Sequence, residues 1–69
     1  ANDKVLNQTE ALKILKVTPI YNQVAPKLKQ GLKVKGQDKG DFYLITVYDK
    51  RGAGNIFVTK NLKYTILGN

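Results

Sequence analysis

The sequence lacks most of the side chains that proteins use for covalent and acid–base chemistry. Its 69 residues include no Cys, His, Ser or Trp. Their absence removes the common acyl-transfer nucleophiles, the base that titrates near neutral pH and the usual zinc ligands. We therefore expect this chain to have no catalytic residues, no metal site and no cofactor. The lack of cysteine fits an oxidising compartment and a reducing one equally.

Long apolar runs and acidic residues are also scarce. The sequence contains no run of about 18 apolar residues, the length that a membrane span requires, so no membrane association is expected. Of the five acidic residues, only Asp38 and Asp41 lie close enough in sequence to suggest a pair, and they flank a turn. Two solvated turn carboxylates are the favoured interpretation, and a weak cation site is the alternative.

Twelve Lys and Arg residues give the chain a net charge of +7. Together with the aromatic residues, this charge is typical of small sheets that bind nucleic acid. Arginine, the usual reader of phosphates and bases, occurs only as Arg51, which weakens that interpretation. The favoured explanation of the positive charge is that four lysines keep an edge strand soluble. These lysines are Lys27, Lys29, Lys33 and Lys35.

One helix is predicted near the N-terminus, over Thr9–Lys16. Thr9 is the expected N-cap, Glu10 lies in the first turn and lysines lie towards the end, all of which suit the helix dipole. Ala11, Leu12 and Leu15 form one apolar stripe that should face a core. Two prolines restrict residues 17–26, so this segment is predicted as a connector of unassigned form.

From Leu28 onward the apolar period changes from helical spacing to two, which predicts strands. Leu28, Leu32 and Val34 alternate with Lys29, Lys33 and Lys35 in the first of them. Further strands are expected at 41–49, 55–59 and 62–68, with turns at 36–40, 50–54 and 60–61, and 41–49 should be central. The prediction is an α+β fold in which the N-terminal helix packs on a four-stranded antiparallel meander. The residues expected to be buried are Leu12, Leu15, Leu32, Leu44 and Phe57.

The C-terminal segment carries a family resemblance. From Ile56 to Gly68 it reads aliphatic, aromatic, aliphatic and Thr, then a polar turn, Lys–Tyr, two β-branched residues, Leu and Gly. This order resembles the end of the N-terminal dimerisation domain of DsbC/DsbG-type periplasmic thiol:disulfide interchange proteins. The predicted order of elements and the length agree with that cystatin-like domain.

The resemblance implies that residues 1–69 are a dimerisation module of a longer periplasmic protein whose thioredoxin-fold domain is absent from this chain. Such a module forms a homodimer and positions two catalytic domains around a misfolded client protein. The implied dimer interface is the last strand, and its residues are Tyr64, Thr65, Ile66, Leu67 and Gly68. A free-standing basic module that binds nucleic acid and a cystatin-like protein-docking domain remain the alternatives.

Overall fold

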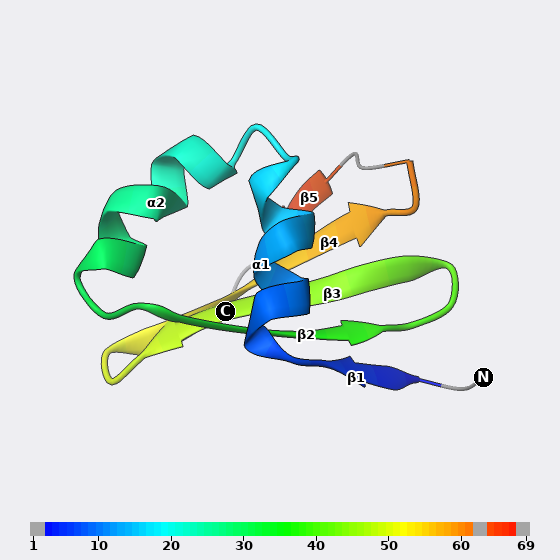
Figure 1. Cartoon of the computed structure of the whole chain (residues 1–69), viewed down its shortest axis with the longest axis horizontal. Helices are drawn as coiled ribbons and strands as arrows, with labels where there is room; N and C mark the ends of the chain where they lie inside the picture. The colour runs from blue at the N-terminus through cyan, green and yellow to red at the C-terminus, as the bar shows by residue number, and fades with distance from the viewer. Residues whose placement is uncertain (1–2, 62–63, 68–69) are drawn as a thin grey trace.

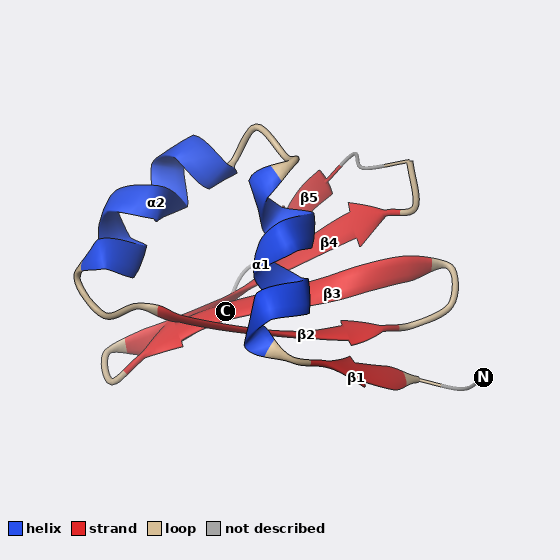
Figure 2. Ribbon diagram, in the orientation of Figure 1, coloured by secondary structure: helices blue, strands red, loops and turns tan. Residues whose placement is uncertain are grey.

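The described residues, 3–61 and 64–67, form one five-stranded antiparallel sheet with two helices against one of its faces (Figures 1 and 2). The structure is a computed structural model. In chain order its elements are β1 (Lys4–Leu6), α1 (Gln8–Lys16), α2 (Tyr21–Lys29), β2 (Lys33–Asp38), β3 (Phe42–Asp49), β4 (Gly52–Thr59) and β5 (Tyr64–Leu67). The α+β class is therefore confirmed. The predicted meander corresponds to β2–β5, and β1 adds a fifth strand beside β2.

The N-cap of helix α1 lies two residues earlier than predicted. Asn7, not Thr9, is the N-cap: its side chain accepts from the Glu10 backbone N–H at 2.8 Å, and the Glu10 carboxylate accepts from the Asn7 N–H at 3.2 Å. This reciprocal capping box satisfies two donors that a helix start leaves free. Asn has a cap preference at least equal to that of Thr, and the Glu three residues later was the available signal.

A second helix, α2, occupies sequence that was predicted as a connector followed by a strand. The helix ends in a Schellman motif, in which Leu32 N–H bonds the Lys27 carbonyl at 3.0 Å and Gly31 N–H bonds the Leu28 carbonyl at 3.2 Å. Gly31 has the positive φ of +105° that this ending requires. Pro26 lies inside α2 on an exposed stretch, where water can replace the missing backbone hydrogen bond.

The sheet order is β1-β2-β3-β4-β5, so β3 is central, as predicted for residues 41–49. Strand β2 lies between β1 and β3, so the prediction of a lysine-rich edge strand is wrong. Lys27 and Lys29 belong to α2, whereas only Lys33 and Lys35 lie on β2. The β3–β4 turn is also shorter than predicted, because Asp49 already pairs with Gly52 and only two residues separate the strands.

The hydrophobic core lies between the helices and one face of the sheet. It contains Ala11, Leu15, Ile20, Val24, Val34, Ile45, Ile56 and Val58. Of the residues predicted to be buried, Leu15 is fully buried, while Leu12 and Leu32 are partly buried against the core. Leu44 and Phe57 face each other across β3 and β4, one position out of phase with the buried Ile45–Ile56 pair. The predicted phase of these two strands is therefore wrong, because side chains alternate between faces.

Gly36 allows α1 to approach the sheet closely. A Cβ atom at this position would lie 3.2 Å from Ala11 Cβ and 3.0 Å from Ile45 Cδ1. Both distances are shorter than ordinary van der Waals contact, so a side chain here would push the helix from the strand. Gly36 was predicted to be part of a turn, but it lies within β2 and lets α1 pack on the strand.

Candidate functional site: a free edge and an uncovered face

Acidic residues do not gather into a cation site in the part of the chain that the structure describes. Within residues 3–61 and 64–67, no group of three or more His, Cys, Asp or Glu side chains is placed to hold a metal ion. Asp38 accepts from Lys60 Nζ at 3.0 Å and from the Gly40 N–H at 2.9 Å, so its carboxylate is engaged by the chain itself. Asp41 is an exposed residue in the same turn. This geometry favours two turn carboxylates over a cation site.

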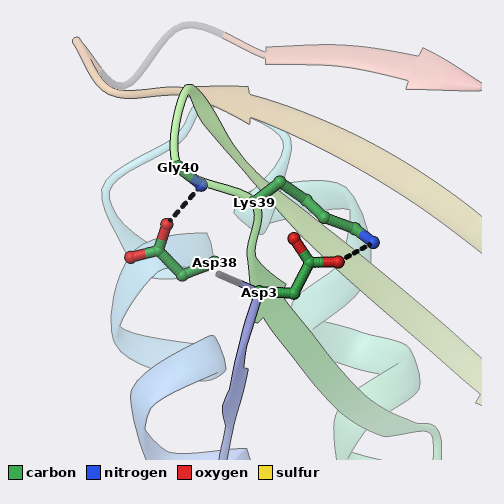
Figure 3. A network of polar contacts seen from close by, with 4 residues as sticks. All are labelled: Asp3, Asp38, Lys39 and Gly40. Atoms are coloured by element: carbon green, nitrogen blue, oxygen red, sulfur yellow. Dashed lines mark hydrogen bonds and ion pairs between the residues drawn. The ribbon is translucent and has the colours of Figure 1, made fainter. Parts of the chain in front are cut away.

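The polar contacts of this turn join three parts of the chain at one end of the sheet. Lys39 Nζ donates to Asp3 Oδ2 at 2.8 Å, which ties the β2–β3 turn to the segment before β1 (Figure 3). Asp38 connects the same turn to the β4–β5 turn through Lys60. Lys60 Nζ also lies 4.0 Å from the centre of the Tyr43 ring, within the range of a cation–π contact.

These contacts shift two pKa values in opposite directions. The pKa of Asp38 is lowered, first by the hydrogen bond from the Gly40 backbone and then by the hydrogen bond from Lys60. The pKa of Lys60 is raised, chiefly by its hydrogen bond to Asp38. Both groups are at the surface, so the pair is exposed to solvent and to salt.

Strand β5 forms one edge of the sheet. Its residues Tyr64, Thr65, Ile66 and Leu67 pair with β4 from Val58 to Asn55, so the predicted interface residues do form an edge strand. The edge of a sheet presents backbone N–H and C=O groups that can pair with another chain. The segment Tyr64–Leu67 contains no charged residue and no proline, the residue types that commonly block such pairing. Gly68, the last predicted interface residue, lies outside the described residues.

The opposite edge, β1, differs from β5 in charge and is one residue shorter. It is three residues long and begins with Lys4, next to the Asp3–Lys39 ion pair. Short strands and charged side chains are the usual means by which proteins prevent edge-to-edge association. The two edges are therefore not equivalent, and β5 is the better candidate for pairing with a second strand.

The helices leave the second face of the sheet uncovered within the described residues. The strand register places the following residues of β1–β4 on it: Val5, Lys33, Lys35, Gln37, Phe42, Leu44, Thr46, Tyr48, Asn55 and Phe57. Several of them are large and apolar, and Val5 is 74% exposed. Sequence reasoning missed this surface because it assigned Leu44 and Phe57 to the core.

Aromatic rings on the uncovered face contact other side chains of the same face. Phe42 and Phe57 stack with their ring centres 4.4 Å apart and their planes inclined by 20°. Lys35 Nζ lies 5.2 Å from the centre of the Tyr48 ring. Each of these three rings therefore has one side occupied by a neighbouring residue.

A shallow depression of about 290 Å³ lies on the uncovered face beside β1. It is lined by Val5, Lys35, Gly36, Gln37, Leu44 and Thr46. Gly36 contributes backbone atoms to its lining, because a side chain at this position would point to the helical face. The lining thus combines the apolar side chains of Val5 and Leu44 with the polar residues Lys35, Gln37 and Thr46.

A larger groove, of about 630 Å³, lies between α2 and the β3–β4 hairpin on the helical side. Val24, Leu32 and Val47 supply its apolar part, and Gly52–Gly54 leave room on β4. Lys27, Asp49 and Arg51 supply charges of both signs around it. This groove depends on α2, which the sequence reasoning did not predict.

Comparisons with family models, curated proteins and solved structures find no match to this chain. In the described part of the chain, no helix is long and apolar enough to cross a membrane.

Proposed function

We propose that this chain is a cystatin-like dimerisation module of a periplasmic disulfide isomerase or chaperone. Two copies associate through β5 and so position two catalytic domains, which belong to the longer parent protein, around a client protein. The observation that carries the proposal is the difference between the two sheet edges, because β5 has no charged residue while β1 begins with Lys4. The C-terminal sequence pattern and the antiparallel β2–β5 meander also support it.

Pairing of β5 with its symmetry mate would extend the sheet across a two-fold axis. An isologous contact of this kind satisfies the free backbone groups of both edges at once. Each copy carries a net charge of +7, so long-range repulsion opposes the association. Because salt screens that repulsion, the dimer should become tighter as ionic strength rises.

Nucleic-acid binding is the second candidate function, and it makes the opposite prediction for salt. Lys33 and Lys35 lie on the same face as three aromatic rings, an arrangement that single-strand binding sheets use. A complex that depends on phosphate contacts releases counterions and weakens steeply as salt is added. A salt titration therefore distinguishes the two candidate functions, because added salt should strengthen the dimer and weaken a nucleic-acid complex.

Sedimentation equilibrium tests the proposed interface. At about ten to a hundred micromolar, where a modest interface would be populated, the wild-type chain should have twice the monomer mass. Thr65→Lys, which places a charge in the middle of β5, should be a folded monomer, and Gly68→Arg should behave in the same way. Gln30→Lys adds the same charge at an exposed site outside the sheet and should remain dimeric.

Circular dichroism of each variant checks that the fold is retained. A wild-type chain that stays monomeric over this range at low and high salt would overturn the proposal, as would a Thr65→Lys variant that dimerises like wild type. Binding of oligothymidine that weakens with salt would instead support the nucleic-acid function.

A further inference from the structure

The uncovered sheet face has a row of three features along β2. The depression lies beside Gln37, which pairs with both Val5 and Leu44, and it is followed on the same face by Lys35, which also lines it, and then by Lys33. Residues two apart in a strand lie about 6.6–6.8 Å from each other on one face. The row therefore presents an apolar position and two cationic positions at the spacing that alternate residues of an extended peptide have.

Charge complementarity indicates what this surface can bind. The register places Lys33 and Lys35 on the uncovered face of β2, whereas Asp38 and Asp49 lie on the helical face of their strands. A second copy of the chain would bring a further charge of +7 to this surface, which disfavours face-to-face association of two copies. An acidic partner suits the surface better.

The engaged aromatic rings favour a peptide over a single-stranded nucleic acid. Base stacking uses exposed aromatic faces, and one face of each ring is already occupied here, because Phe42 and Phe57 stack on each other and Lys35 lies over Tyr48. The depression, in contrast, requires no aromatic face but an apolar side chain that contacts Val5 and Leu44. Apolar side chains of unfolded polypeptides meet that requirement.

We propose that the uncovered face binds extended polypeptide in which an apolar residue and two acidic residues occupy alternate positions. The apolar side chain enters the depression beside Val5 and Leu44, and the two carboxylates bind Lys35 and Lys33. This inference rests on the proposed function only in naming the peptide as part of a client protein. The surface itself is distinct from the β5 edge, so binding does not require the dimer.

Tryptophan fluorescence offers a direct test because the chain has no Trp of its own. The probe is a short peptide with the core Trp-Thr-Glu-Thr-Glu, whose emission should shift to the blue when the indole enters the depression. Matched peptides replace both Glu by Lys, or move the Trp to the adjacent position. The expected result is saturable binding of the first peptide, at least about tenfold tighter than that of the Lys peptide.

Two pairs of variants localise the site. Val5→Glu should weaken binding about tenfold, whereas Val17→Glu, at the other large exposed valine, should leave it unchanged. Lys35→Glu should weaken binding about fivefold to tenfold, whereas Lys29→Glu, on the exposed side of α2, should change it less than twofold. Circular dichroism checks the fold of each variant, and the Lys35 pair keeps the test valid if Val5→Glu does not fold.

The same titration on the Thr65→Lys variant separates this inference from the proposed dimer. Peptide binding retained by a monomer supports the uncovered face independently of β5. Equal binding of the Glu and Lys peptides, or no loss of binding in Val5→Glu and Lys35→Glu, would overturn the inference while leaving the dimer intact. Oligothymidine that binds more tightly than the acidic peptide would also overturn it, in favour of nucleic acid.

Discussion

The two faces of the sheet are made by the same strands but differ in what covers them. On the helical face, Ile45 is fully buried and its partner Ile56 is 3% exposed. On the other face, the adjacent pair Leu44 and Phe57 is only half-buried. A shift of one residue thus separates the core from a surface of similar hydrophobicity. The comparison shows that apolar side chains in this sheet do not by themselves indicate the interior.

The largest expected contrast between the faces comes from truncating neighbouring residues of β3. Ile45→Ala should lower the free energy of unfolding by about 2–5 kcal/mol, because it leaves a cavity in the core. Leu44→Ala should cost about 1 kcal/mol, since part of that side chain is already exposed to water. Chemical denaturation followed by circular dichroism measures both.

Protein concentration provides the control for this pair. If Leu44→Ala costs as much as Ile45→Ala, and the cost grows with protein concentration, the uncovered face is covered by another copy in solution. That result would contradict the description of this face as a free surface.

A smaller contrast is expected between two glycines whose side chains would point to the helical face. Gly36→Ala should destabilise the fold by about 1–3 kcal/mol, because the new Cβ meets Ala11 and Ile45 at 3.2 and 3.0 Å. Gly54→Ala meets only Val47 Cγ2 at 3.8 Å and should be neutral or stabilise by up to about 1 kcal/mol. Denaturation midpoints measure both.

The double variant Ala11→Gly/Gly36→Ala tests the physical cause. Removal of the Ala11 methyl group should recover part of the stability lost in Gly36→Ala, after the cost of Ala11→Gly alone is subtracted. If Gly36→Ala and Gly54→Ala were equally stable, α1 would not pack on β2 as closely as in the structure.

The positions of the strands could be predicted from the sequence better than the face that each strand buries or the helices that pack against the sheet. Strand β3 was placed correctly because its apolar and β-branched run is long and is bounded by turn residues. Its phase could not be predicted, because residues 42–48 are apolar or aromatic on both faces except for Thr46, and alternation then carries little signal. Helix α2 was missed because two prolines bias the local sequence against helix, and tertiary burial of Ile20 and Val24 overrides that bias.

For the candidate site, local sequence indicated the edge strand but not the open face. The segment Tyr64–Leu67 was recognised as a last strand, and in a meander a last strand lies at an edge. The depression near Gly36 depends on β1, a three-residue strand too short to leave a periodic signal. The pairing of Val5 with Gln37 joins residues 32 positions apart, and the sequence alone gives no register for such a contact.

The smallest expected effect concerns the Asp38–Lys60 ion pair at one end of the helical face. Lys60 of this pair lies over the ring of Tyr43. The pKa of Asp38 is below its usual value of 3.8 in the folded state, so its contribution to stability is complete above that pH. The contribution is lost as the pH falls through the lowered pKa. The pKa of Lys60 is above its usual value of 10.5, so its contribution is complete below that pH and is lost on further alkalinisation.

Asp38→Asn should therefore be less stable than wild type at neutral pH, and the difference should shrink at both extremes. Urea denaturation midpoints of the two proteins, measured from acidic to alkaline pH, test how this stability difference depends on pH. The difference should also shrink with added salt, because the pair is exposed to solvent. Asp41→Asn, an exposed change in the same turn, is the matched control and should follow wild type. A stability difference between Asp38→Asn and wild type that persists well below pH 3.8 would mean that Asp38 acts through local turn geometry and not through its charge.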